Sequence, residues 1–264
     1  MKPAILFNFI LLLITLSCET KKELKTVSGI KQTPSGILSN LLNGNLDSAS
    51  GIIKWAATEG DIIEYNGQLI DSQYLYSSID TVFTIKRNNE TEYLAVFSTA
   101  PMTKDDMGKM VSASDCHVCG LKIGYFTYTI VNDSLQIQTF RKNFATHGTF
   151  GEKSYLVSFV NLGDGYEILK IDDPYNGMGI STVTTKFYMS GELLLSMISR
   201  EDNAGNYDST QKGYYEFKTD FAYNPSKHTI NINQTGFKID EISGKRKSIL
   251  KRKELPFDQY SLSF

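Results

Sequence analysis

Short alternating segments joined by turn residues constrain the fold of this chain most strongly. The clearest is IGYFTYTIVNDSLQIQTF, residues 123–140, in which two strand-like halves meet at Asn132 and Asp133. Asn and Asp tolerate the positive φ of a two-residue hairpin turn, and the flanking β-branched and aromatic residues favour strands. We therefore expect an antiparallel hairpin here.

Four further segments show the same pattern, and helical apolar spacing is hard to find in any window longer than about ten residues. Five hairpins imply ten or more strands. We therefore predict an all-β fold, with a single antiparallel domain at residues 51–264, as a hairpin meander, sandwich or barrel, or as an irregular propeller. The four additional turns are expected at Asn88-Asn89, Gly163-Asp164-Gly165, Ser190-Gly191 and Asn224-Pro225.

Two segments are expected to be helical instead. GILSNLLNGNL, residues 36–46, is predicted to form a helical turn or two docked on the domain. PMTKDDMGKM, residues 101–110, is predicted to form a short helix, since Thr103 can cap its start and Asp105 and Asp106 favour a helix N-terminus.

The first residues have the features of a signal peptide. Residues 4–16 are almost continuously apolar, but this run is shorter than the ~20 residues that a membrane-spanning helix needs. Thr15-Leu16-Ser17-Cys18 then resembles the lipobox of bacterial lipoproteins, in which a small residue precedes the cysteine that is acylated.

This resemblance implies a signal peptide at residues 1–17, a lipidated Cys18 and a membrane anchor made of acyl chains. Residues 18–50 are rich in Ser, Lys, Asn, Gly and Thr and are predicted to form a tether. The expected location is extracytoplasmic and membrane-anchored, on the periplasmic or surface face of a bacterial cell envelope.

With Cys18 acylated, Cys116 and Cys119 are the remaining cysteines. In an oxidising compartment we expect them to form a local disulfide that pins the loop before the strand at residue 121. The alternative is a thiol-redox site. It is disfavoured because the residues after Cys119 alternate like a strand and so provide no helix N-terminus to lower a thiol pKa.

Metal binding is a second alternative for the same loop. Cys116 and Cys119 could bind zinc or copper together with His117, and His147 or His228 could complete the site. The chain offers no second Cys-x-x-Cys pair, although a structural zinc site usually has four ligands.

The loop also resembles one found in uncharacterised secreted bacterial proteins that carry an Asp-Cys-His-x-Cys-Gly motif, here residues 115–120. GTFG at residues 148–151 and DNAGN at residues 202–206 extend the resemblance. It implies that the loop is important and implies no activity.

Three polar segments have simpler structural explanations. Asp172 and Asp173 precede a proline and indicate a turn instead of a catalytic pair. Residues 199–210 form a polar loop whose spacing does not match a calcium-binding loop. The basic residues of segment 244–253 indicate a solvated edge strand or loop, with contact to anionic lipid or polysaccharide as the alternative.

The net charge of −2 gives no preference for nucleic acid. No phosphate-binding or serine-nucleophile motif is present, so we expect no cofactor and favour a non-enzymatic role. The sequence predicts a lipid-anchored binding or envelope-structural module, whose aromatic β-faces could take a carbohydrate, a peptide or an envelope protein. The alternative function is the metal-binding or thiol-redox protein described above.

Overall fold

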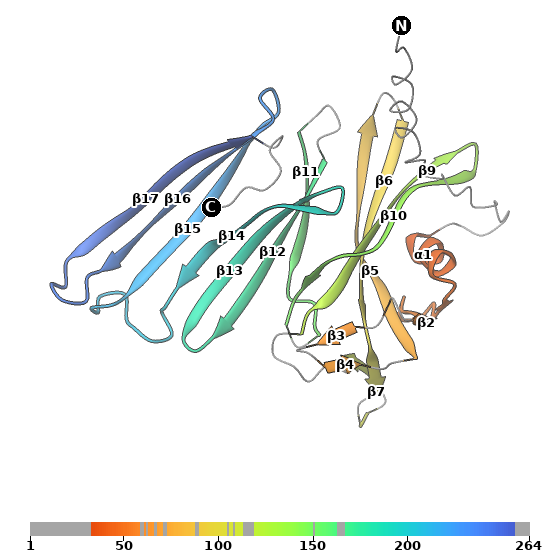
Figure 1. Ribbon diagram of the computed structural model, residues 1–264, viewed down its shortest axis with the longest axis horizontal. Coiled ribbons are helices and arrows are strands. Elements are labelled where there is room, and N and C mark those ends of the chain that lie inside the picture. Colours follow the sequence, from red (N-terminus) through yellow and green to blue (C-terminus); the bar gives the residue numbers. More distant parts are fainter. Residues whose placement is uncertain are drawn as a thin grey trace, which may run out of the picture.

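The part of the chain that the structure describes folds mostly into antiparallel β-sheet (Figure 1). The computed structural model describes residues 33–58, 61, 63–65, 68–70, 73–87, 90–104, 106–107, 109–112, 119–149, 151–162 and 167–256. These residues form one helix, a six-stranded sheet, a seven-stranded sheet and two two-stranded sheets. The predicted all-β class with ten or more strands is confirmed.

The six-stranded sheet has the order β1-β2-β5-β6-β9-β10, with every neighbouring pair antiparallel. Its turn at Asn132 and Asp133 has φ values of 49° and 61°, as the sequence predicts for a tight hairpin. The turn expected at residues 88–89 lies outside the described residues, but the strands on either side of it pair. The strands are β1 (Asn45–Leu46), β2 (Ile53–Ala56), β5 (Tyr74–Arg87), β6 (Glu90–Ala100), β9 (Leu121–Val131) and β10 (Ser134–His147).

The seven-stranded sheet is a meander in which spatial order follows sequence order. The predicted turn at Ser190 and Gly191 is confirmed, with φ values of 52° and 84°, and β15 turns after Asn224 as expected. The turn expected at residues 163–165 lies outside the described residues. The strands are β11 (Leu156–Asn161), β12 (Glu167–Gly177), β13 (Ile180–Met189), β14 (Glu192–Asp202), β15 (Tyr215–Asn224), β16 (Thr229–Ile239) and β17 (Arg246–Pro256).

Strands β6 and β9 are buried on both faces. Alternate residues of each strand enter different apolar clusters: Phe97 and Phe126 pack on the α1 side, whereas Val96 and Tyr125 pack toward the seven-stranded sheet. Because both faces are covered, these strands show runs of consecutive buried residues instead of alternation. The second cluster joins the two sheets, since Leu169 and other residues of β12 and β13 belong to it.

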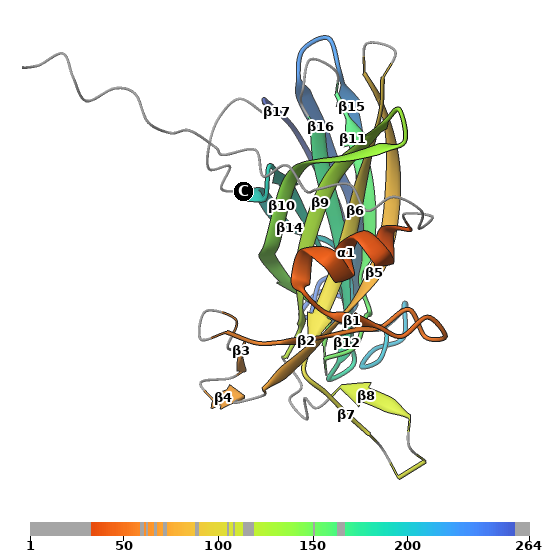
Figure 2. The same ribbon diagram turned by 90° about the vertical axis from the view of Figure 1, so that its right-hand side faces the viewer.

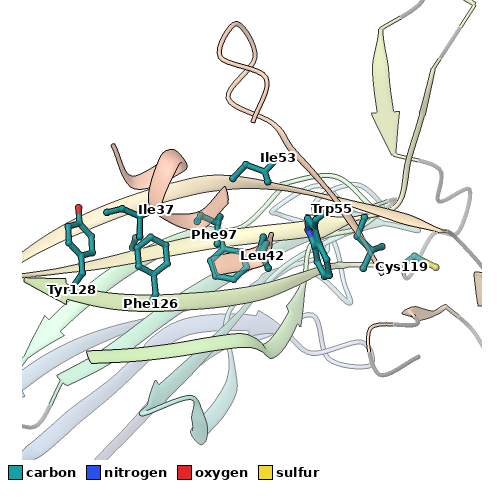
Figure 3. Packing of buried hydrophobic residues seen from close by; sticks show 11 residues of the cluster. Ile37, Leu42, Ile53, Trp55, Phe97, Cys119, Phe126 and Tyr128 are labelled. Atoms are coloured by element: carbon teal, nitrogen blue, oxygen red, sulfur yellow. The ribbon is translucent and has the colours of Figure 1, made fainter. Parts of the chain in front are cut away.

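Helix α1 (Pro34–Leu42) lies across the outer face of the six-stranded sheet (Figure 2). Thr33 caps its start, because the Oγ1 atom accepts a hydrogen bond from the Gly36 amide, and Asn43 ends it in the left-handed conformation. The helical turn predicted for residues 36–46 is thus present. Its buried residues pack with Trp55, Phe97 and other core side chains (Figure 3). Residues 33–46, predicted as part of a tether, therefore include α1, which packs on the sheet, and β1, which belongs to it.

The far part of the seven-stranded sheet curls back on itself. β14 and β15 share three paired positions at one end, Arg200–Asp202 with Glu216–Lys218, so the two strands can separate along the rest of their length. Phe221 of β15 thereby reaches Phe187 of β13, with ring centroids 5.2 Å apart. A third apolar cluster fills this curl.

The helix predicted for residues 101–110 is wrong. The segment instead forms the β7 (Met102–Lys104) and β8 (Met110–Ser112) pair. Asp106 lies in the turn between the strands. Asp favours turns as well as helix N-termini, so Asp106 is compatible with the observed turn as well as with the predicted helix. A second small hairpin joins β3 (Ile63–Tyr65) to β4 (Gln68–Ile70).

The turn predicted at Asp172 and Asp173 is also wrong, because both residues lie inside β12. The prediction took Pro174 as a turn residue. Asp172 is the last residue of β12 that pairs with β11, so from Pro174 onward β12 pairs with β13 alone. Its other edge is free there, and the strand tolerates a proline, which has no amide hydrogen.

The basic segment forms β17, the exposed edge strand that the sequence predicted. The polar segment at residues 199–210 is a connection from residue 203 onward, whereas Arg200 and Asp202 still belong to β14. No helix in the described part of the chain is long and apolar enough to cross a membrane.

Candidate functional site

A cleft of about 580 Å³ lies between the facing surfaces of the two large sheets. One wall comes from β6, β9 and β10, and the other comes from β11, β12 and β13 with its turn into β14. Strand alternation explains which side chains line it, since every second residue of a strand faces the same side. The wall residues of β6 and β9 are Glu90, Glu92, Leu94, Tyr125, Thr127 and Thr129.

Register places the polar wall residues together. Glu92 pairs with Thr129, and Leu94 pairs with Thr127 one step further along the strands. Strand β10 contains a β-bulge, because Gln138 has no partner in the ladder whereas Ile137 and Thr139 do. As a result, the neighbouring residues Gln138 and Thr139 both line this wall of the cleft.

Two threonines of the cleft have hydroxyl groups that make no hydrogen bond within the part of the chain that the structure describes. Thr127 is 7% exposed and Thr129 is 8% exposed, so each side chain is more than nine-tenths buried. No described residue hydrogen-bonds either hydroxyl group, and both side chains line the cleft. Among the described residues, the buried side-chain polar atom without a partner is Ser154 Oγ, so the two threonine hydroxyl oxygens are themselves open to the cleft. Water or a ligand in the cleft can therefore bind them.

The charged side chains that line the cleft are all acidic. Glu90 and Glu92 come from β6, and Glu167 comes from the start of β12 on the opposite wall. No lysine or arginine is among the described residues that line it. Glu92 and Glu167 each interact with another group of the protein.

A polar chain leads away from the cleft through Tyr188. The Tyr188 hydroxyl group lies 2.9 Å from Nε2 of His147, and Nδ1 of His147 lies 3.1 Å from Oδ2 of Asp173. One ring nitrogen of His147 is therefore held by a carboxylate and the other by a hydroxyl group. Burial and the nearby Asp173 charge raise the pKa of Tyr188, so its hydroxyl group stays protonated.

A second buried polar group also bridges the sheets. Asp80 is the bulge residue of β5, and its carboxylate accepts hydrogen bonds from the hydroxyl groups of Tyr155 at 2.6 Å and Ser98 at 2.9 Å. Lys153 Nζ lies 3.1 Å from the same carboxylate. Burial, followed by the Asp80 charge, raises the pKa of Tyr155. This group does not line the cleft, and its role is structural.

Among the residues that the sequence singled out, Cys119 is described and is disulfide-bonded. It is 2% exposed and belongs to the cluster beneath α1 (Figure 3). Its carbonyl oxygen accepts a 2.6 Å hydrogen bond from the Gly151 amide, so the cysteine loop and the GTFG segment are in contact. Cys18, Cys116 and His117 lie outside the described residues, and the Cys116–Cys119 pairing stays a prediction.

The histidines proposed to complete a metal site lie in different environments. Both ring nitrogens of His147 are engaged, by Asp173 and Tyr188, and His228 lies at the turn between β15 and β16. In the described part of the chain, no group of three or more His, Cys, Asp or Glu residues could hold a metal ion. The metal hypothesis for the loop itself stays a prediction.

The sequence analysis did not single out the cleft. One signal could have indicated it: polar residues recur at alternate positions of β6 and β9, as in Glu90-x-Glu92 and Thr127-x-Thr129. That these positions face a second sheet depends on long-range packing, which strand alternation does not reveal.

Comparisons of the chain with protein-family models, with curated proteins and with solved structures find no match.

Proposed function

We propose that this chain is a lipid-anchored extracytoplasmic binding protein whose ligand site is the cleft between the two sheets. The observation that carries the proposal is a cleft of about 580 Å³ between the two sheets, lined by apolar and aromatic side chains and by the hydroxyl-bearing side chains of Thr127 and Thr129. That volume falls within the roughly 300–1,000 Å³ of small-molecule sites, and a mixture of apolar walls with a few polar groups is typical of them.

The fold supports a pre-formed site. Most wall residues lie on paired strands, β6 with β9 and β12 with β13, and the apolar cluster shared by the two sheets fixes one wall relative to the other. A site on packed strands is better defined than one on loops, so a ligand would bind with little ordering of the protein.

Amide chemical-shift mapping tests the site. We would titrate the purified protein with small amines, alcohols, carboxylates and monosaccharides, and we expect at least one class to shift the amides of Leu94, Thr127 and Leu169. The Thr127→Val variant keeps the side-chain shape and removes the hydroxyl group, so it should weaken that response. Shifts scattered over the surface, or confined to other faces, would refute the cleft as the site.

The lipid anchor rests on the features of residues 1–18 and is tested separately. Replacing the proposed acylated residue, as Cys18→Ala, should release the protein from the membrane fraction of the producing bacterium. Continued membrane association of the unacylated variant would show that something other than the lipid holds it there.

The thiol-redox alternative receives less support, because Cys119 is 2% exposed and a redox-active cysteine has to be accessible. Alkylation of denatured, unreduced protein followed by mass spectrometry should leave Cys116 and Cys119 unmodified, with both becoming reactive after reduction. Free thiols at these positions, together with stoichiometric zinc or copper, would favour the metal-binding alternative.

A further inference from the structure

We propose that one end of the seven-stranded sheet rests on a lipid bilayer and inserts apolar side chains from two of its turns. This contact is separate from the cleft and adds a second, non-covalent attachment to the lipid anchor proposed above. The end consists of three connections: the β12–β13 turn, residues 203–214 between β14 and β15, and residues 240–245 between β16 and β17.

The meander places these three connections together. Every second turn of an antiparallel meander lies at the same end of the sheet, and Figure 1 shows the three connections at one end. The middle connection contacts both others. Asn206 Nδ2 donates to the Met178 carbonyl oxygen at 2.8 Å, and Lys212 Nζ donates to the Ile242 carbonyl oxygen at 3.0 Å. The three connections therefore form one hydrogen-bonded surface.

Two large aliphatic side chains project from this surface. Met178 is 91% exposed and Ile242 is 89% exposed, and Tyr207 of the middle connection is 41% exposed. The described turns at the opposite end of the sheet instead present polar side chains such as Ser190 and Ser226. The two ends of the sheet therefore differ in the side chains that their turns present.

Turn geometry does not account for a methionine at position 178. Met178 and Gly179 have φ values of 52° and 76°, the positive values of a type I′ turn, whose first position favours Asn, Asp and Gly. Two other tight turns of the chain have Asn132 and Ser190 at this position. A long side chain is unusual in this conformation, and Met178 gains no burial in return. An exposed residue in an unfavourable conformation indicates a contact outside the chain.

The side chain of Ile242 is likewise not needed to close its turn. The Asp240 carboxylate accepts hydrogen bonds from the amides of Ile242 and Ser243, and the Asp240 carbonyl oxygen accepts one from the Gly244 amide. These bonds use the backbone of residue 242, which any residue except proline supplies. The isoleucine side chain is therefore available for another contact.

A lipid bilayer fits this surface. The charged residues of the three connections are Asp208, Lys212, Asp240, Glu241 and Lys245. Their charges nearly cancel, so the attraction is apolar and needs no anionic lipid. Met178 and Ile242 can reach the hydrocarbon boundary, whereas Tyr207 and the two lysines lie at the headgroups, where amphipathic side chains prefer to be.

The proposed anchor keeps the bilayer within reach. A segment as long as residues 18–32 spans at most about 50 Å, so the start of α1 stays within that distance of the membrane that holds Cys18. This confinement gives a high local concentration, so a weak contact by two side chains is sufficient.

Paramagnetic broadening in NMR spectra tests the contact. The full chain would be placed on phosphatidylcholine bicelles that contain lipid with a nitroxide in its upper acyl chain. We expect strong broadening of the Met178 and Ile242 methyl signals, and none at Leu193 and Leu250, which are 50% and 61% exposed. Because the contact is apolar, the broadening should persist at high salt.

The double variant M178N/I242S removes both side chains. Burial of one large aliphatic side chain contributes about tenfold or more to partitioning, so broadening of the Gly179 and Gly213 amides should fall by about tenfold or more. The variant should unfold at no lower temperature than the parent, since Asn is favoured at the turn position. The control, L193S/L250S, removes similar apolar surface elsewhere and should leave the broadening unchanged.

Equal broadening at all four methyl sites, or broadening confined to other faces, would overturn the proposal. Concentration-dependent shifts of Met178 and Ile242 without lipid would instead show that a second copy covers this end. If Cys18 is not acylated, the chain is added to excess bicelles, where broadening at the two side chains supports the contact and its absence refutes it. Failure of the anchor and failure of this contact are thus distinguished.

Discussion

Asp80 and His147 are the residues that connect the two sheets through polar contacts. The bulge at Asp80 turns its side chain out of the ladder, so that the carboxylate meets Tyr155 just before β11. His147, the last residue of β10, meets Asp173 and Tyr188 of the other sheet. Because the Asp80 side chain is 1% exposed, losing a donor to it would leave a buried charge poorly satisfied.

The Tyr155→Phe variant tests the contact with Asp80, because it removes only the hydroxyl group of Tyr155. We expect the free energy of unfolding to fall by about 2 kcal/mol, the cost of removing a hydrogen bond to a buried charged group. Urea denaturation measures it, with Tyr175→Phe as the control because Tyr175 is 41% exposed. Equal stability of the two variants would show that the Tyr155 hydroxyl group contributes nothing.

At the scale of single elements, a polar contact fixes the segment after β2 against β10. Lys142 Nζ lies 2.8 Å and 3.0 Å from the two carboxylate oxygens of Asp61 and 4.8 Å from the ring centre of Trp55. Burial raises the pKa of Asp61, but hydrogen bonds from Lys142 and Thr58 outweigh it, so the pKa lies below its ordinary value of 3.8.

A carboxyl group with a lowered pKa stabilises the fold above its unfolded-state pKa and loses this effect as the pH falls through the folded-state value. Asp61→Asn should therefore lower the free energy of unfolding by about 1 kcal/mol at neutral pH, and the difference should shrink below about pH 4. Urea melts at several pH values check this, with Asp220→Asn as the exposed control. A difference that is constant with pH would contradict the ion pair.

The elements also differ in how well the sequence predicts them. Hairpins with strong turn residues, such as Asn132-Asp133 and Ser190-Gly191, were predicted at the correct positions because local chemistry decides them. The β7–β8 pair and the strand through Pro174 were missed, since pairing partners outweighed local signals there. The cleft was missed because it forms between distant strands.

Gly124 marks another position that sequence periodicity does not explain. A Cβ atom there would lie 2.2 Å from the Phe97 ring and 2.6 Å from the Lys142 carbonyl oxygen, where β10 bulges over β9. Gly124→Ala should cost at least about 2 kcal/mol of stability, because the core cannot absorb the extra methyl group without shifting. Unchanged thermal stability of this variant would mean that β10 does not approach β9 so closely.

At the scale of the whole molecule, the two large sheets form one structure through a shared apolar cluster. Phe83 stacks on Phe159 with centroids 5.6 Å apart, and Phe144 meets Tyr188 edge-on at 5.1 Å. The same facing surfaces continue into the cleft, where glutamates and threonines replace apolar side chains. The packing that holds the sheets together therefore also creates the proposed binding site.

Intermolecular NOEs between a ligand found in the screen and methyl-labelled protein test this account most directly. We predict contacts from the bound ligand to the methyl groups of Leu94 and Leu169, one on each wall, and to the methyl groups of Thr127 and Thr129. Contacts to residues of one sheet alone, or to methyl groups outside the cleft, would contradict a ligand held between the sheets.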